Sequence, residues 1–260
     1  MPVERRDWRR PLRYAWRTPL LLVHALIAVP LALAVFNPLA RRVALGGERL
    51  DWRMTRWWSG RIVRIFGFRV RRAGEPLPGA VLFVANHVSW LDIELMHSQR
   101  IMSFVAKAEI ARWPLIGWLA TRAGTIYHQR GSAHSLGAVM ERVVVRLREG
   151  MAAGIFPEGG TGPGDRVKTF HARIFQVAAD AEVPVQPVAL CYGDGGRMDP
   201  RVPFAPKENF LQNFLRLLGG PSFEATVHFL EPVEPSDDGR RQTAEAARER
   251  IAQALGLPAP

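Results

Sequence analysis

From residue 80 onward, short apolar runs alternate with amphipathic stretches, and this alternation constrains the fold more than any other feature of the sequence. A short apolar run bounded by glycine or proline predicts a buried strand, whereas apolar residues spaced three and four apart predict a helix. Strands alternating with helices predict an α/β domain with a mostly parallel central sheet flanked by helices. The predicted strands are Val81–Ala85, Met102–Ala106, Thr125–His128, Gly154–Phe156, Val185–Tyr192 and Ala225–Leu230.

Helices are expected between and after these strands. The clearest one covers Ser132–Glu149, where apolar residues recur every three or four positions from Leu136 to Leu147. The segment Asp199–Asn213 holds too many prolines for a regular element, so it is expected to form a loop. Further helices are predicted at Ile110–Ala120, Phe170–Ala181 and Thr243–Ala254.

The first predicted strand leads directly into a histidine and an aspartate five positions apart, His87 and Asp92. If the chain turns after Asn86 and a helix starts near Ser89, the carboxylate can fold back onto the imidazole. It would then fix the tautomer and leave the other ring nitrogen free to accept a proton. Of the 7 histidines, only His87 has an acidic residue five positions later. Ordinary turns and helix caps use the same residue types, so spacing alone leaves a structural role open as well.

Other polar residues also stand where a predicted strand ends. Lys107 closes the second strand, Arg130 follows the third, and Glu158 with Gly159 follows the fourth. The carboxyl ends of parallel strands share one edge of a sheet, where α/β proteins place their binding crevices. The sequence therefore predicts a crevice in which a base, two cations and a carboxylate come together.

Arginine dominates the charge of the chain and is concentrated near its beginning. The formal net charge is +11, and only Lys107, Lys168 and Lys207 are lysines. In the first 72 residues the arginines are interleaved with tryptophan and phenylalanine, a mixture that suits a membrane interface. A basic arm that binds nucleic acid would have a similar composition, so that alternative stays open.

Two apolar segments in this N-terminal region predict a helix pair that docks on a membrane. The run Leu20–Phe36 is almost uninterrupted, and Leu50–Phe68 has an apolar stripe with arginines opposite it. Positive charge on both sides of the first run favours insertion into one leaflet over a full span or a cleaved signal peptide. Residues 1–72 are therefore assigned to the helix pair and residues 80–260 to the α/β domain, with a breaker-rich link between them.

Four segments together resemble the motifs of the glycerolipid acyltransferases of the lysophosphatidate acyltransferase type. Their order and spacing agree with the family across residues 80–190, which is more specific than any single motif. The N-terminal 72 residues resemble the family's membrane-docking helix pair in character only. The four segments are residues 86–92 (Asn-His-Val-Ser-Trp-Leu-Asp), 124–130 (Gly-Thr-Ile-Tyr-His-Gln-Arg), 156–159 (Phe-Pro-Glu-Gly) and 183–188 (Val-Pro-Val-Gln-Pro-Val).

This resemblance implies transfer of a fatty acyl group from a thioester to the free hydroxyl of a lysophospholipid, with 1-acyl-sn-glycerol-3-phosphate as the first candidate and phosphatidate as its product. It implies no metal and no bound cofactor, because the co-substrate is acyl-CoA or an acyl carrier protein thioester. The implied partner is the lipid bilayer, at the cytoplasmic face of a bacterial inner membrane, and not nucleic acid. The implied catalytic residues are His87 and Asp92, and the implied substrate-binding residues are Lys107, Arg130, Glu158 and Gly159.

Two departures from the family pattern leave the acceptor open. Gly160 intervenes before Thr161, where the family continues directly with threonine or serine, and residues 169–173 lack the usual phenylalanine–lysine–glycine pattern. Another lysolipid, such as lyso-ornithine lipid, is therefore an alternative acceptor. A non-catalytic basic protein that binds membranes or nucleic acid is the alternative from another class. A hydrolase with Ser89 as nucleophile is disfavoured, because no Gly-x-Ser-x-Gly elbow surrounds that residue.

Overall fold

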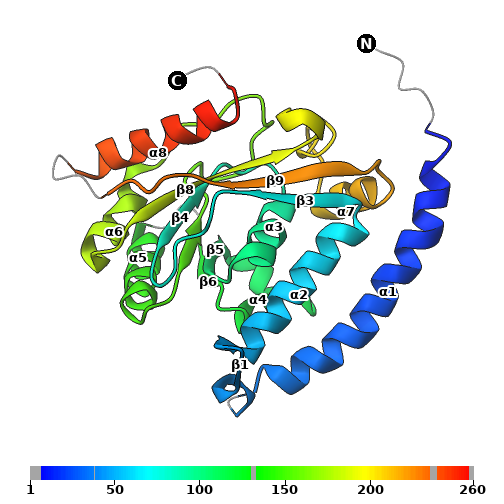
Figure 1. Ribbon diagram of the computed structural model, residues 1–260, viewed down its shortest axis with the longest axis horizontal. Coiled ribbons are helices and arrows are strands. Elements are labelled where there is room, and N and C mark those ends of the chain that lie inside the picture. Colours follow the sequence, from blue (N-terminus) through cyan, green and yellow to red (C-terminus); the bar gives the residue numbers. More distant parts are fainter. Residues whose placement is uncertain (1–6, 38, 130–132, 235–238, 258–260) are drawn as a thin grey trace.

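A seven-stranded sheet forms the centre of the computed structural model, which describes residues 7–37, 39–129, 133–234 and 239–257 (Figure 1). The strand order is β3-β9-β8-β4-β7-β5-β6. Strands β8, β4, β7, β5 and β6 are parallel, whereas β9 is antiparallel to β8 and parallel to β3, so the mostly parallel sheet is confirmed. The bounds are β3 Phe68–Ala73, β4 Leu82–Ala85, β5 Ser103–Lys107, β6 Ile126–His128, β7 Ala153–Ile155, β8 Val185–Tyr192 and β9 Phe223–Phe229.

Helices cover both faces of the sheet, and β4 shows how its side chains divide between them. Phe83 and Ala85 pack into the core that contains residues of α2 and α3, while Leu82 and Val84 pack into the core beneath α5, α6 and α8. Every residue of β4 is buried, as expected for a central strand covered on both faces. The helices are α2 Leu50–Ile65, α3 Leu91–Gln99, α5 Ala133–Arg148, α6 Gln176–Ala181 and α8 Arg240–Ala254.

The sheet begins earlier in the chain than the sequence indicated. The helix predicted over Leu50–Phe68 ends at Ile65, Gly67 turns the chain with φ 89°, and β3 then pairs with β9. No strand was predicted there because three of the six residues of β3 are arginines. An edge strand can carry such residues, since its outer side faces solvent. The last residues of the segment assigned to the helix pair thus belong to the sheet.

The prediction of one continuous helix over Ile110–Ala120 is wrong. A 3₁₀ helix, η2 (Ala108–Arg112), ends before Trp113, and α4 (Ile116–Arg122) begins after Leu115, whose φ is 60°. Pro114 causes the interruption, because proline disfavours helical backbone in the residue before it. Trp113 accordingly adopts extended angles.

A helix also begins inside the segment predicted to be a loop. Helix α7 (Phe210–Leu218) starts at a capping box in which the Asn209 side chain accepts from the Gln212 N–H and the Gln212 side chain accepts from the Asn209 N–H. These two bonds satisfy backbone donors that a helix N-terminus leaves free. The predicted helix Phe170–Ala181 is in turn shorter, a 3₁₀ turn η3 (Ala172–Phe175) followed by α6. The remaining short elements are η1 Ala40–Arg42, β1 Ala44–Leu45, β2 Glu48–Arg49 and η4 Asp194–Gly196.

Helix α1 (Arg10–Val35) runs along the outside of the molecule next to α2 (Figure 1). It is long and apolar enough to cross a membrane by length and composition, and it starts well before the predicted Leu20. Its inner face is formed by Arg17, His24, Ala28 and Ala32. The large apolar side chains that it exposes are Leu12, Trp16, Leu20, Leu22, Val23, Leu26, Ile27, Leu31 and Leu33.

The first half of α1 is tied to the α/β domain by polar contacts. Arg17 is only 1% exposed and donates to the Leu218 and Gly220 carbonyls at 2.9 and 2.8 Å. The Tyr14 hydroxyl donates to the Leu215 carbonyl at 2.6 Å. These acceptors belong to the end of α7 and the turn after it. This part of the arginine–aromatic segment therefore binds the protein's own backbone, where the sequence predicted a membrane interface.

Candidate active site

The turn after β4 is held in place by Asn86. Its side-chain amide donates to the Leu190 carbonyl at 2.9 Å, and its carbonyl oxygen accepts from the Leu190 N–H at 2.8 Å. This paired contact with β8 is buried, so it fixes the end of β4 where the chain leaves the sheet. His87 follows at once and is therefore carried by a rigid part of the fold.

Asp92 lies in the first turn of α3 and folds back onto His87. Its Oδ2 atom is 2.7 Å from Nδ1 of His87 and also accepts from the N–H groups of Val88 and Ser89 at 2.7 and 2.9 Å. The side chain is completely buried, a position in which a carboxylate needs several donors. The structure thus has the geometry that the spacing of the two residues predicted.

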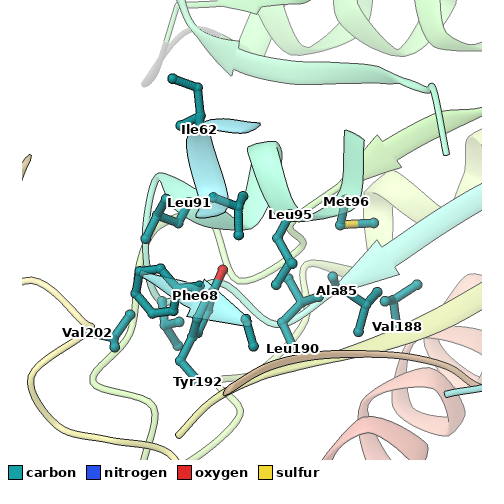
Figure 2. Packing of buried hydrophobic residues seen from close by; sticks show 14 of the residues in the cluster. Ile62, Phe68, Ala85, Leu91, Leu95, Met96, Val188, Leu190, Tyr192 and Val202 are labelled. Carbon is teal, nitrogen blue, oxygen red and sulfur yellow. The ribbon is translucent and has the colours of Figure 1, made fainter. Parts of the chain in front are cut away.

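Tyr192, at the end of β8, hydrogen-bonds the second carboxylate oxygen of Asp92. Its hydroxyl donates to Oδ1 at 2.6 Å, and Figure 2 shows the phenol oxygen directed from the strand layer toward α3. Burial, together with the Asp92 charge, raises the pKa of the Tyr192 hydroxyl well above its ordinary value, so it remains a donor. Local sequence spacing does not reveal this contact, because Tyr192 stands one hundred positions after Asp92. Its only signal was its place at a strand end.

The His87 side chain is packed on one face and partly exposed. Phe156 stacks on the ring at a centroid distance of 4.0 Å, and the side chain is 16% exposed. Among the residues that the structure describes, none hydrogen-bonds Nε2. Because Nδ1 donates to the carboxylate, Nε2 holds the free lone pair and can accept a proton.

Both carboxylate oxygens of Glu158 accept hydrogen bonds from backbone N–H groups. One oxygen accepts from the His87 N–H at 2.9 Å, and the other accepts from the Lys168 N–H at 3.4 Å. Burial raises the pKa of the carboxyl, although these hydrogen bonds and the Lys168 charge oppose that shift. On the other side of His87, the Gly162 N–H donates to its carbonyl at 2.6 Å. The resemblance implies that Glu158 binds the substrate, and the structure shows that its carboxylate also positions the backbone of His87.

Gly159 has a local structural reason to be glycine. Its φ is 72°, and a Cβ atom at this position would lie 2.9 Å from Nε2 of His171. A side chain would therefore be strained by the backbone and would also displace the imidazole. Lys168 braces the same loop by donating to the Thr161 carbonyl at 2.8 Å.

The predicted cation Lys107 lies apart from the central residues. Lys107 ends β5, is 46% exposed, and has its Nζ 3.4 Å from Oε1 of Glu109. Two strand spacings, roughly 10 Å, separate β5 from β4 on the same edge of the sheet. Arg130 lies outside the described residues. The structure therefore joins His87, Asp92 and Glu158 by direct hydrogen bonds and leaves Lys107 at a strand end two strands away.

A largely apolar cavity of about 360 Å³ lies between the sheet and helices α1, α2, α3, α4 and α7. Phe104 lines it and stacks on Phe156 at 5.6 Å, and Phe156 in turn stacks on His87. Trp90, two residues before Asp92, also lines it. The cavity thus reaches the immediate surroundings of the histidine and has the lining that a hydrocarbon chain requires.

Together, a free imidazole nitrogen, a buried carboxylate behind it and a nearby apolar cavity are the arrangement expected of an enzyme that activates a hydroxyl beside a lipid chain. The sequence model of the Acyltransferase family matches residues 69–191. The lyso-ornithine lipid O-acyltransferase of Pseudomonas aeruginosa is 38% identical over 252 residues, 96% of each chain. This chain belongs to the PlsC-like acyltransferase family and is a lysolipid acyltransferase.

Two further comparisons cover the acceptor type first predicted. The 1-acyl-sn-glycerol-3-phosphate acyltransferase of Neisseria gonorrhoeae is 40% identical over 128 residues, 49% of this chain and 50% of that protein. The crystal structure of the 1-acyl-sn-glycerophosphate acyltransferase PlsC from Thermotoga maritima has a TM-score of 0.72, with 19% identity, and the match covers 96% of this chain and 97% of that one. The structural likeness shows the same fold. These matches favour the enzymatic interpretation over the non-catalytic one.

The hydroxyl of Tyr192 gives a first prediction. Replacing Tyr192 with phenylalanine leaves Oδ1 of Asp92 buried without its donor, and a hydrogen bond to a charged group contributes about 1.5–3 kcal/mol. We expect kcat for acyl transfer to fall by about ten- to a hundredfold with little change in KM. Steady-state kinetics of the purified variant would measure this.

A matched control is Tyr127→Phe, because the Tyr127 hydroxyl donates to the Gly117 carbonyl, away from His87. An unchanged kcat in the Tyr192 variant, or an equal loss in both variants, would contradict the role assigned to Tyr192.

Proposed function

We propose that this protein transfers a fatty acyl group from an acyl thioester to the hydroxyl of lyso-ornithine lipid at a membrane surface. The match that carries the choice of acceptor is the Pseudomonas aeruginosa relative, which is similar along nearly the whole chain. Lysophosphatidate is the second candidate, because a Neisseria relative named for that acceptor is similar over about half the chain. The departures at Gly160 and at residues 169–173 also favour a headgroup other than glycerol phosphate.

In the proposed reaction, Nε2 of His87 takes the proton of the acceptor hydroxyl while that oxygen attacks the thioester carbonyl. The buried Asp92 carboxylate stabilises the imidazolium that forms. A carbon–oxygen bond forms, the carbon–sulfur bond breaks, and the proton passes from His87 to the leaving thiolate. The acceptor oxygen is itself the nucleophile, so the reaction needs no covalent enzyme intermediate, metal or bound cofactor.

The binding roles follow from charge and shape. Lys107 and Arg130 are proposed to bind the anionic group of the acceptor, which is a carboxylate in an ornithine headgroup and a phosphate in lysophosphatidate. The apolar cavity beside Trp90 and Phe104 is proposed to hold a fatty acyl chain. Glu158 and Gly159 support this site indirectly, through the His87 backbone and the His171 contact.

Helix α1 supports the proposed membrane docking. Its exposed apolar side chains would enter one leaflet, with the cytoplasmic face of a bacterial inner membrane as the proposed location. The inner side of α1 borders the cavity, so a lipid acceptor could reach the site without leaving the membrane surface. The net charge of +11 favours an acidic acyl carrier protein or the phosphates of coenzyme A as the carrier of the donor.

A four-way assay tests the acceptor and the donor together. Purified full-length protein in vesicles would be given lyso-ornithine lipid or lysophosphatidate, each with acyl-CoA or acyl carrier protein thioester, and products would be quantified by mass spectrometry. We expect kcat/KM for lyso-ornithine lipid to exceed that for lysophosphatidate by about tenfold or more, as a site built for one headgroup discriminates against another. A preference for lysophosphatidate would overturn the acceptor but retain the reaction, whereas no product in any arm would overturn both.

A further inference from the structure

Large apolar side chains are exposed at only two places in the part of the chain that the structure describes after α2. Four of them, Leu115, Ile116, Leu211 and Leu215, lie at the start of α4 and in α7. The fifth, Val145, belongs to α5, which covers the other face of the sheet. Soluble monomers rarely gather exposed apolar residues at one place without a binding role. The group of four therefore indicates an interaction surface.

The four side chains form one patch at the mouth of the apolar cavity. The rings of Trp113 and Phe210 have a centroid distance of 4.8 Å, and this contact brings the two segments together. Both rings line the cavity. Leu115 and Ile116 line it as well and are also exposed, so the cavity opens to the surface beside them. The cavity-mouth patch is defined as Leu115, Ile116, Leu211 and Leu215.

The turn that carries Leu115 is held in a strained conformation. Leu115 has a φ of 60°, which residues other than glycine seldom adopt. The Gly117 N–H donates to the Trp113 carbonyl at 2.9 Å, and a Cβ atom at Gly117 would lie only 2.4 Å from the Ala111 carbonyl oxygen. Such strain persists only where the surrounding structure enforces it, and it is concentrated at functional sites. The close packing of η2 on α4 thus keeps an apolar side chain at the surface.

We propose that the cavity-mouth patch inserts into the same membrane leaflet as α1, so that the cavity opens directly into the bilayer. The inference rests on the membrane docking in the proposed function and adds a second inserted surface to it. The two surfaces are adjacent, because the Tyr14 hydroxyl of α1 donates to the Leu215 carbonyl of α7 at 2.6 Å. At the other end of α1, the Phe36 ring contacts that of Trp118 in α4 at 6.1 Å. The cavity mouth therefore has α1 on one side and the cavity-mouth patch on the other.

The surroundings of the patch favour a bilayer as the partner. Residues 110–122 include the exposed Arg112 and Arg122 and no acidic residue, a composition that suits anionic lipid headgroups. A lipid chain that reached the cavity through water would expose its apolar surface on the way, which is unfavourable. With both sides of the mouth inserted, the chain stays in apolar surroundings throughout. An acidic acyl carrier protein is the competing partner for a basic, apolar surface, and the test separates the two.

The first test places an environment-sensitive fluorophore on single cysteines introduced into the full-length protein. Leu115→Cys and Leu211→Cys probe the patch, Leu26→Cys probes the exposed face of α1, and Val145→Cys is the matched control. Wild type measures the labelling background, since its single cysteine, Cys191, is buried. The vesicles contain phosphatidylglycerol and phosphatidylethanolamine with brominated acyl chains, which quench a probe that enters the hydrocarbon region. In a parallel arm, acyl carrier protein is added without vesicles.

We expect the brominated vesicles to reduce fluorescence about twofold at residues 26, 115 and 211 and to leave it unchanged at residue 145. Quenching at residue 26 without quenching at residues 115 and 211 would overturn this inference and leave docking by α1 intact. Equal quenching at residue 145 would also overturn it. A response at residues 115 and 211 to acyl carrier protein alone would assign the patch to that partner instead. No quenching at residue 26 would overturn the proposed membrane docking together with this inference.

A paired variant then measures what the patch contributes to turnover. Leu211→Ser combined with Leu215→Ser changes two side chains that are exposed and lie outside the cavity lining. We expect kcat/KM for a lysolipid acceptor embedded in vesicles to fall about tenfold, and kcat/KM for a short-chain acceptor dissolved as monomers to stay unchanged. Val145→Ser is the matched control and should change neither value. An equal loss with both acceptors, or no loss with either, would contradict the role of the patch.

Discussion

Replacing His87 with alanine is expected to lower kcat for acyl transfer by about 10²–10⁴-fold, because a positioned general base contributes that much to such reactions. The ring has its Nδ1 atom held by the Asp92 carboxylate and its Nε2 atom free of hydrogen bonds to the described residues, and the side chain is partly exposed. The side chain packs on Phe156 but is not part of the main core, so the fold should survive its removal. Initial rates with saturating donor and acceptor would measure the loss.

The matched control is His228→Ala, which removes an imidazole from β9 instead of the turn after β4. Vesicle sedimentation and thermal unfolding of the His87 variant should resemble those of wild type, since α1 and the core are untouched. Residual activity above about one per cent of wild type would contradict the general-base role.

Replacing Asp92 with asparagine gives the second large expected effect, for a different reason. Three donors face Oδ2, and one hydroxyl faces Oδ1. The asparagine oxygen is therefore expected to take the Oδ2 position and its amino group to face Tyr192, whose hydroxyl can accept. The His87 ring then keeps its orientation, but the negative charge of Asp92 that stabilises the imidazolium is lost. Removing one partner of a buried charge pair costs about 3–5 kcal/mol, so kcat should fall by about 10²–10⁴-fold.

A double-variant cycle makes this prediction sharper. His87 and Asp92 act as one unit in the proposed mechanism, so the combined variant His87→Ala with Asp92→Asn should lose no more activity than His87→Ala alone. If the two losses instead multiply, Asp92 acts on catalysis by a route that does not pass through His87. Stability measured by denaturant unfolding of all three variants would separate that result from unfolding of the turn.

Local patterns in the sequence predicted much of the fold. The strand Val185–Tyr192 has the bounds that its apolar run predicted, and the strands around Leu82, Ser103 and Ala153 differ from their predicted bounds by at most one residue at either end. Two misses had signals in the sequence as well. Pro114 interrupts the predicted helix before α4, and the Asn209–Gln212 spacing is that of a capping box.

The sequence by itself determined that His87 and Asp92 meet, because five residues across one turn and the start of a helix leave the carboxylate few other places to point. It also determined which residues end strands, and parallel pairing then places Lys107 and Glu158 on the same edge as His87. These are consequences of periodicity and short-range geometry. They require no knowledge of distant contacts.

Only the tertiary structure decided what surrounds the histidine. Tyr192 reaches Asp92 across one hundred residues, and Glu158 binds the His87 backbone across seventy-one. The edge strand β3 likewise exists because β9 pairs with it from the far end of the chain. A hydrogen bond between distant segments depends on the order of strands and the depth of burial, and neither is encoded in any local pattern.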